Sequence, residues 1–249
     1  MSKKRRIEIL GVPLDKVTLE QAAQEVERML DEGNTKVIVT PNAEIIMAAQ
    51  KNPALKSAIA ASDLILPDGI GVVIASKIIG SPLPERTAGF DLMVKMLKMA
   101  AGRGLSIYLL GGKPGIAEEA AKNILSRFPG VKVAGTHHGY FDEKQQDEVV
   151  QKINEAKPHF IFVGMGAPRQ ELFMMNNRHN INGSIMMGVG GSLDVFAGRV
   201  KRAPTWMQKT GFEWLYRLLQ EPRRIKRMSV LPLFIVKVLI KVLTERGNK

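Results

Sequence analysis

One aspartate stands where a carboxylate would meet a ligand if the chain folds as an open α/β sheet. It is Asp68, in the segment LPDGIG (66–71), which follows a short apolar run and precedes the helical pattern VVIASKII. Ligands bind at the carboxyl ends of the strands in such sheets, and glycines let the backbone come close to them. Aspartate is also a favoured N-cap residue, so Asp68 could instead cap the following helix. The local sequence alone favours the cap.

Glycines mark the ends of three further apolar runs, at YLLGGKPG (108–115), VGMGAPRQ (163–170) and GVGGSLDVFAG (188–198). Each run leads toward a helix, a geometry in which backbone N–H groups and the helix N-terminus can hold a phosphate. No segment fits the dinucleotide fingerprint or the P-loop motif. Three such loops in one sheet indicate a nucleotide or sugar-nucleotide ligand, although tight turns alone also require glycine. The candidate binding glycines are Gly111, Gly112, Gly164, Gly166, Gly190 and Gly191.

The residues give little support to metal, cofactor or nucleophilic chemistry. His137 and His138 are adjacent, so on a strand their side chains would point to opposite faces. His159 and His179 have no partner at ligand spacing, and Ser192 does not match a nucleophile elbow. The chain has no cysteine, which excludes disulfides and thiol catalysis, and no Asp-x-Asp element. We expect no metal and no cofactor, and we expect arginines to neutralise any leaving diphosphate.

Apolar, β-branched runs alternate with amphipathic segments of helix length as far as about Gly190. Thr18 and Gln21 stand at capping-box spacing before the first helical segment. The expected helices include 18–32, 115–127, 143–156 and 170–178, and the expected strands are 7–10, 36–40, 63–66, 105–110, 131–135, 159–164 and 184–189. This alternation predicts an α/β fold: a Rossmann-like, mostly parallel sheet with helices on both faces, forming a catalytic core over residues 1–199.

The positive charge belongs to the end of the chain. The formal net charge is +12, and residues 199–249 hold 13 Lys or Arg against three acidic residues. Residues 1–198 are nearly neutral. From Thr205 onward the pattern contains no strand, and Gly211, Pro222 and Pro232 punctuate helical pieces. We therefore expect a basic helical appendage at 200–249.

The last helical piece, VLPLFIVKVLIKVLTERG, has an apolar stripe at helical spacing. The stripe consists of Leu231, Phe234, Ile235, Val238, Leu239 and Val242. With about 14 largely apolar residues it is shorter than the roughly 20 needed to span a bilayer. Periodicity leaves two alternatives open, a helix in a membrane interface or a helix packed on the body or on another subunit. The adjacent PRRIKR favours an anionic membrane surface, and self-association to a homo-oligomer would also cover the stripe.

Nucleic-acid binding is the main non-enzymatic alternative. Basic residues beside Trp206, Trp214 and Tyr216 could contact phosphates and stack on bases. The neutral body, the apolar last helix and the lack of a known nucleic-acid motif argue against it. We therefore expect no nucleic-acid partner.

Several motifs together resemble the WecG/TagA/CpsF glycosyltransferases, glycosyltransferase family 26, and most closely its TagA branch of wall teichoic acid synthesis. They are TPNAEI (40–45), LPDGIG, ERTAGFDL (85–92), YLLGGKPG, GMGAPRQE (164–171) and the long segment from 188 to 227. The resemblance implies transfer of N-acetylmannosamine from its UDP derivative to undecaprenyl-diphosphate-linked N-acetylglucosamine. It further implies a β-1,4 bond made with inversion and without a metal, by a peripheral enzyme on the cytoplasmic face of the cell membrane. A related donor, such as UDP-N-acetylmannosaminuronic acid, is the alternative.

The same resemblance assigns roles to individual residues. It implies that Asp68 is the single base that an inverting transfer needs. Thr40 and Asn42 would contact the acceptor sugar or position the base. Arg86 and Gln170 would contact sugar or diphosphate.

The resemblance also gives the appendage a part in the site. It implies that the appendage folds over the active site and supplies Arg217, Arg224 and Arg227 to the diphosphates. The alternative for these arginines is binding to lipid headgroups alone. Closure at the membrane would limit hydrolysis of the sugar nucleotide away from its lipid acceptor.

Overall fold

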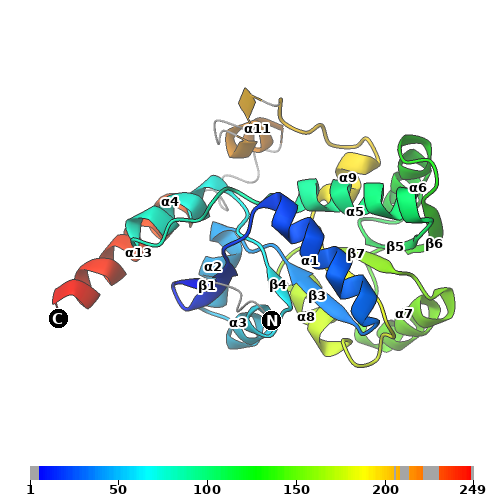
Figure 1. Ribbon diagram of the computed structural model, residues 1–249, viewed down its shortest axis with the longest axis horizontal. Helices are drawn as coiled ribbons and strands as arrows, with labels where there is room; N and C mark the ends of the chain where they lie inside the picture. Colours follow the sequence, from blue (N-terminus) through cyan, green and yellow to red (C-terminus); the bar gives the residue numbers. More distant parts are fainter. Residues whose placement is uncertain (1–5, 205, 208–212, 221–229, 248–249) are drawn as a thin grey trace.

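One parallel β-sheet forms the centre of the protein (Figure 1). The computed structural model describes residues 6–204, 206–207, 213–220 and 230–247. Six strands lie in the order β4-β3-β8-β7-β5-β6, and all neighbouring pairs are parallel. They are β3 Lys36–Val39, β4 Leu64–Ile65, β5 Ser106–Gly111, β6 Lys132–His137, β7 Phe160–Gly164 and β8 Ile185–Gly188. The predicted α/β fold with a mostly parallel sheet is confirmed.

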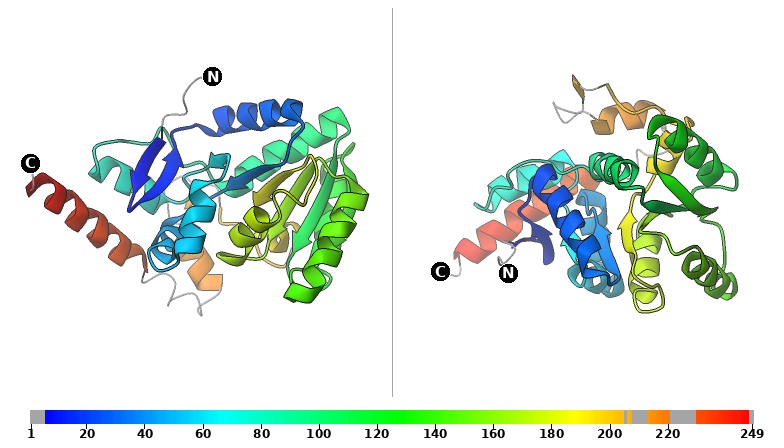
Figure 2. Two further views of the ribbon diagram at one scale, coloured as in Figure 1. Left: turned by 90° about the horizontal axis from the view of Figure 1, so that it is seen from below. Right: turned by 45° about the vertical axis from the view of Figure 1, so that its right-hand side comes forward.

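Helices cover both faces of this sheet (Figure 2). Along β7, Phe160 and Phe162 belong to one hydrophobic cluster, whereas Ile161 and Val163 belong to the other. Successive strand side chains point to opposite faces, so each cluster fills one face. One face is covered by α1 Leu19–Glu32, α5 Gly89–Arg103, α6 Ile116–Arg127 and α9 Ser192–Phe196. The other is covered by α2 Ala43–Ala49, α3 Pro53–Ala60, α7 Glu143–Ala156 and α8 Arg169–Asn176.

The first strand forms a hairpin outside the main sheet. β1 Arg6–Ile9 pairs with β2 Val12–Asp15 in antiparallel register, through a two-residue turn in which Leu10 and Gly11 both have positive φ. Such turns match the twist of a hairpin. The sequence predicted β1 but missed β2, because a proline in the run VPLD argues against a strand except at a sheet edge.

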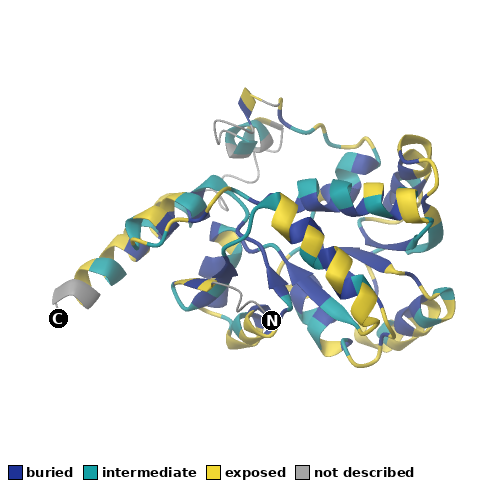
Figure 3. Ribbon diagram, in the orientation of Figure 1, coloured by how far each residue is buried: buried dark blue, intermediate teal, exposed yellow. Residues whose placement is uncertain are grey.

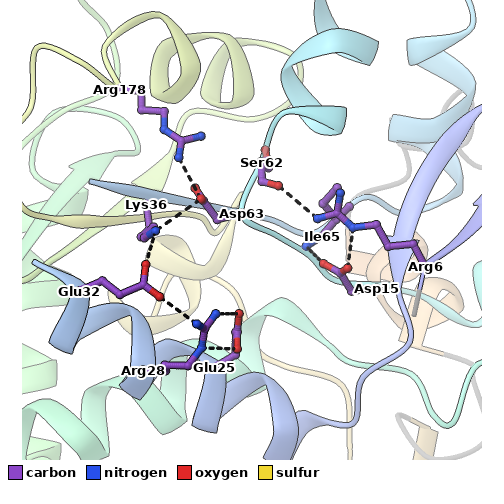
Figure 4. Close-up of polar contacts among 10 residues, drawn as sticks. All are labelled: Arg6, Asp15, Glu25, Arg28, Glu32, Lys36, Ser62, Asp63, Ile65 and Arg178. Carbon is purple, nitrogen blue, oxygen red and sulfur yellow. Dashed lines mark hydrogen bonds and ion pairs between the residues drawn. The ribbon is translucent and has the colours of Figure 1, made fainter. Parts of the chain in front are cut away.

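Buried polar contacts hold the short strand β4 in place (Figure 4). The Asp15 carboxylate is fully buried, and it accepts hydrogen bonds from Ile65 N (2.8 Å) and from Arg6 Nε (2.8 Å). At the start of the strand, the Asp63 carboxylate accepts from Val37 N (2.8 Å) and from Arg178 Nη2 (2.9 Å). These contacts fix β4, and with it the segment LPDGIG that follows.

The predicted capping box of the first helix is confirmed. Thr18 Oγ1 accepts from Gln21 N (3.2 Å), and Gln21 Oε1 accepts from Thr18 N (2.9 Å). These two bonds satisfy backbone donors that a helix N-terminus otherwise leaves unpaired.

The last helix, α13 Val230–Gly247, lies against α2 and α4 at one end of the molecule (Figure 1). Phe234 and Val238 are buried there in the core cluster of that face. Gly71 of α4 Ile70–Ile78 allows the close approach, since a Cβ on it would lie 2.5 Å from Leu231 Cδ1. Packing on the body, one of the two expected environments, is therefore confirmed for this side of α13.

The opposite side of α13 is apolar as well and faces outward (Figure 3). Its large side chains are 43 to 67% exposed: Leu233, Val236, Leu239, Ile240 and Leu243. Leu239 therefore lies on the outer side and not on the packed stripe. No helix in the described part of the chain is long and apolar enough to cross a membrane.

Candidate active site

The predicted site residues of the core come together at one edge of the sheet. Thr40 follows β3, Asp68 follows β4, and the glycine-rich segments follow β5, β7 and β8. Because the strands are parallel, all these segments leave the sheet at its carboxyl edge, where open α/β sheets bind ligands. The structure therefore gathers at this edge residues from Thr40 to Gly191, which are far apart in the sequence.

Backbone hydrogen bonds join three of the segments that carry candidate side chains. Asp68 N donates to Pro41 O (3.3 Å), which places Asp68 beside the stretch from Thr40 to Asn42. Thr87 N donates to Pro67 O (3.1 Å), which brings Arg86 to the same place. A Cβ on Gly89 would lie 2.9 Å from Thr40 Cγ2, so the start of α5 approaches Thr40 closely only because residue 89 is glycine.

Asp68 is not the N-cap of the helix that follows it. The N-cap of α4 is Gly69, which has φ 88°, and the helix begins at Ile70. The capping interpretation favoured by the local sequence is therefore wrong, because the left-handed turn at Gly69 starts the helix one residue later. Asp68 is partly exposed at the edge of the sheet.

Asn42 has a structural partner. Its side-chain oxygen accepts from Ile45 N (3.0 Å), so Asn42 is the N-cap of α2. The cap fixes the chain directly after Thr40, and Thr40 Oγ1 reaches Gly188 O at 3.5 Å. A substrate role for either residue stays a prediction.

Gln170 is almost fully buried at the start of α8. Its side-chain oxygen accepts from Gly190 N (3.1 Å), and its Nε2 donates to Glu171 Oε1 (2.8 Å). A Cβ on Gly188 would lie 2.9 Å from Gln170 Nε2. Gln170 thus links the segment after β7 to the segment after β8.

The candidate glycines fall into two groups. A Cβ on Gly111 would lie 2.3 Å from Gly164 O, and one on Gly164 would lie 2.8 Å from Gly190 O. Close approach of neighbouring strand ends is a sufficient reason for glycine at these two positions. Gly166 and Gly190 have left-handed φ of 74° and 51°, and a Cβ on either would meet no described atom within 4 Å. These two border open space at the carboxyl edge.

The remaining two candidate glycines, Gly112 and Gly191, each directly follow another candidate glycine. Gly112 has φ 70°, and its N–H donates to Gly164 O (3.0 Å). Gly191 is the N-cap of α9 with φ −80°, so its backbone conformation does not require glycine. A phosphate-binding role for the six glycines stays a prediction.

An ion pair connects Arg86 with the appendage. Arg86 Nη2 lies 3.0 Å from Glu213 Oε2, and both side chains are less than a fifth exposed. Glu213 is the first residue of α11 Glu213–Gln220. Arg217 belongs to the same helix, although its side chain lies outside the described residues, as do Arg224 and Arg227 altogether. One part of the appendage therefore reaches a predicted site residue.

The linker to the appendage is attached to the core by two arginines. Arg202 Nη2 lies 2.7 Å from Asp91 Oδ1, and the Arg202 guanidinium stacks over the ring of Phe90. Arg199 pairs with Glu119 on α6. The sequence motifs did not single out Arg202, Glu213 or Glu171, although all three lie inside the segments that carried the family resemblance.

The histidines do not have the expected geometry. β6 ends at His137, so His138 has left the extended strand, and the two rings lie 4.6 Å apart instead of on opposite faces. The His159 ring contacts Ser106. Over the described ranges, no three His, Asp or Glu side chains form a cluster that could hold a metal ion.

The carboxyl edge of this parallel α/β sheet carries a carboxylate, an arginine and open glycine turns. This is the architecture of an enzyme that acts on a small anionic ligand. The model of the Glycosyl transferase WecG/TagA/CpsF family matches residues 7–248. This chain belongs to that family.

Two named relatives match most of the chain. A protein of Bacillus spizizenii is 40% identical over 210 residues, which cover 84% of this chain and 81% of the relative. A protein of Staphylococcus aureus is 38% identical over 239 residues, which cover 95% of this chain and 93% of the relative. Both carry the name N-acetylglucosaminyldiphosphoundecaprenol N-acetyl-beta-D-mannosaminyltransferase.

Proposed function

We propose that this protein transfers N-acetylmannosamine from UDP-N-acetylmannosamine to N-acetylglucosaminyldiphosphoundecaprenol, forming a β-1,4 bond. The observation that carries the proposal is the similarity to two transferases of that name along nearly the whole chain. The arrangement of Thr40, Asp68 and Arg86 at the carboxyl edge is consistent with this reaction. The partners are then a UDP-sugar donor and a polyprenyl-diphosphate-linked sugar acceptor.

In the proposed reaction, the Asp68 carboxylate takes the proton of the acceptor hydroxyl. The acceptor oxygen bonds to the anomeric carbon of the donor while the bond from that carbon to the diphosphate breaks on the opposite face. UDP leaves with the bonding electron pair, and the configuration is inverted. Thr40 and Asn42, on the segment bonded to Asp68, hold the acceptor sugar or the base in position.

Arginines neutralise the leaving diphosphate in this proposal, so the transfer needs no metal ion. Arg86 is the described candidate, and Arg217, Arg224 and Arg227 of the appendage are proposed to join it. Gln170 and the glycine turns contact the sugar or the diphosphate. The Arg86–Glu213 ion pair supports a site that is shared by a core of residues 1–199 and an appendage of 200–249.

We further propose that the protein works as a peripheral enzyme on the cytoplasmic face of the cell membrane, where its acceptor is embedded. The outward apolar side of α13 would enter the interface, and Lys237 beside it would face anionic headgroups. A second copy of the chain is the other possible cover for this side, and nucleic acid has no part in the proposal.

A donor screen tests the proposed function. Purified protein is incubated with a short-chain lipid-diphosphate N-acetylglucosamine acceptor and, in turn, UDP-N-acetylmannosamine, UDP-N-acetylmannosaminuronic acid and UDP-N-acetylglucosamine. Mass spectrometry should detect a disaccharide product with the first donor. The Asp68→Asn variant lacks the single base, so its turnover should be about 100-fold lower or more. A product with the uronic acid alone would reassign the donor. Near-normal turnover of the variant would remove Asp68 as the base.

A further inference from the structure

Glu171 is a buried acid that the proposed reaction does not use. It is 1% exposed on the first turn of α8, directly after Gln170. Its Oε1 accepts from Gln170 Nε2 at 2.8 Å, and its Oε2 meets no hydrogen-bond partner among the described residues. A carboxyl group buried in this way requires an explanation, because desolvation makes it costly.

The contact with Glu171 sets the orientation of the Gln170 amide. A glutamine amide has an acceptor oxygen at one end and two N–H donors at the other. The Glu171 oxygen takes the donor end, so the Gln170 oxygen is directed to the Gly190 N–H at 3.1 Å. Rotating the amide by half a turn would set its N–H group against the Gly190 N–H, and its oxygen against Glu171 Oε1, which bears no proton when the proton of a neutral carboxyl is on Oε2. The chain from Glu171 through Gln170 to Gly190 is therefore consistent in only one orientation.

Glu171 can perform this task without a charge. Burial raises the pKa of the Glu171 carboxyl above its usual value, which favours the neutral acid. A neutral carboxyl still has an oxygen that accepts the Gln170 N–H. The arrangement thus needs an acceptor at this point but not a carboxylate, and that distinction can be tested.

We propose that Glu171 is a positioning residue of the transferase, which holds the Gln170 amide so that it fixes the turn at Gly190 and keeps its second N–H for an oxygen of the sugar nucleotide. The proposal rests on the proposed function, since it assigns Gln170 to the substrate. In this proposal Gln170 contacts the sugar nucleotide, and Glu171 acts only through Gln170. Gly190 then keeps its left-handed turn at the open edge of the sheet because its N–H donates to the Gln170 side-chain oxygen.

Two substitutions separate the acceptor from the charge. Glu171→Gln keeps an acceptor oxygen of the same reach, whereas Glu171→Leu keeps approximate size and removes the acceptor. Asn177→Leu is the matched control, because Asn177 is also buried, ends the same helix and bonds to Phe173 O, away from Gln170. Gln170→Ala and the double variant Gln170→Ala/Glu171→Leu complete the set.

The first measurement is amide hydrogen exchange at Gly190 in protein labelled with 15N-glycine, which needs no substrate. Loss of one buried hydrogen bond should speed exchange about tenfold in Glu171→Leu and Gln170→Ala. Glu171→Gln and Asn177→Leu should stay within about twofold of the unchanged protein. Equal exchange in Glu171→Leu and Asn177→Leu would overturn the proposal.

The second measurement is steady-state transfer with UDP-N-acetylmannosamine. We expect kcat/KM for the donor to fall about tenfold in Glu171→Leu, with no further loss in the double variant beyond Gln170→Ala, because the two residues act as one unit. Additive losses of kcat/KM would contradict the positioning role of Glu171. So would a Glu171→Gln variant whose kcat/KM is as low as that of Glu171→Leu. If the unchanged protein transfers no sugar, the proposed function fails, while the exchange at Gly190 still decides whether Glu171 holds Gln170.

Discussion

At the scale of single residues, the site depends on polar groups whose environments differ strongly. Asp68, the proposed base, lies partly exposed at the carboxyl edge. Glu171, on the first turn of α8, is almost completely buried. Burial raises the pKa of the Glu171 carboxyl above its usual value and so favours its neutral form.

The stability of the protein should record the burial of Glu171. Its folded-state pKa is raised, so above its unfolded-state pKa the unfolded chain loses a proton that the folded protein keeps. The free energy of unfolding should therefore fall as pH rises, and level off above the folded-state pKa, by about 1.4 kcal/mol for each unit of pKa difference. Glu171→Gln should remove this dependence. Urea unfolding at pH 4 to 8 checks it, and a constant difference between the two proteins at all pH values would contradict it.

At the scale of elements, short segments are held by contacts from distant parts of the chain. The two-residue strand β4 relies on Asp15 of the hairpin and on Arg178 beyond α8. The helix α11 contacts the core through Glu213 and Arg86, which are 127 residues apart. Such contacts decide where the segment LPDGIG and the helix α11 lie.

The Arg86–Glu213 ion pair should hold α11 on the core. Both partners are mostly buried, and a charged hydrogen bond of this kind contributes about 1.5 to 3 kcal/mol. In Glu213→Gln we expect faster hydrogen exchange across residues 213–220, measured by mass spectrometry. Glu119→Gln is the control, because its pair with Arg199 is exposed and should contribute little. Equal exchange of α11 in both variants would show that other contacts hold this helix.

At the scale of the whole molecule, α13 is apolar on two sides. One side completes the core through Phe234 and Val238, and the other lies exposed. An exposed apolar side of this size is a candidate contact surface. A truncation at about residue 205 would also uncover the core beneath α13, and substitutions on the outer side are therefore the sharper test.

Serine at Val236, Ile240 and Leu243 should greatly weaken docking on anionic liposomes and leave folding intact. Burying such side chains contributes about 1.5 to 3 kcal/mol each, so losing three should lower flotation with the vesicles at least tenfold. Serine at the exposed Leu125 of α6 and at Tyr140 is the control and should leave flotation unchanged. If the triple variant floats like the unchanged protein, α13 is not the docking element. A third outcome would assign this side to self-association. In that case the unchanged protein does not float with the vesicles, and light scattering shows a dimer that the triple variant no longer forms.

Local patterns carried much of the fold. Apolar runs and helical periodicity predicted the six sheet strands, and Thr18 with Gln21 predicted the first helix start, because these signals depend on neighbours a few residues away. The proline in VPLD argued against a strand, so the sequence missed β2. Proline is tolerated at a sheet edge, and only the folded hairpin shows that β2 is such an edge. Glycines after strands predicted the binding edge, but the sequence could not separate close strand packing at Gly111 from an open turn at Gly190.

The sequence by itself therefore determined the class of fold, the edge at which the candidate residues gather and the basic character of the last fifth of the chain. Only the tertiary structure decided that Asp68 stands one residue before the cap of α4, that Glu213 pairs with Arg86 and that Glu171 accepts a hydrogen bond from Gln170. The physical reason is range. Periodicity and capping are set within one or two helical turns, whereas burial and ion pairing depend on which distant segments the folded chain brings into contact.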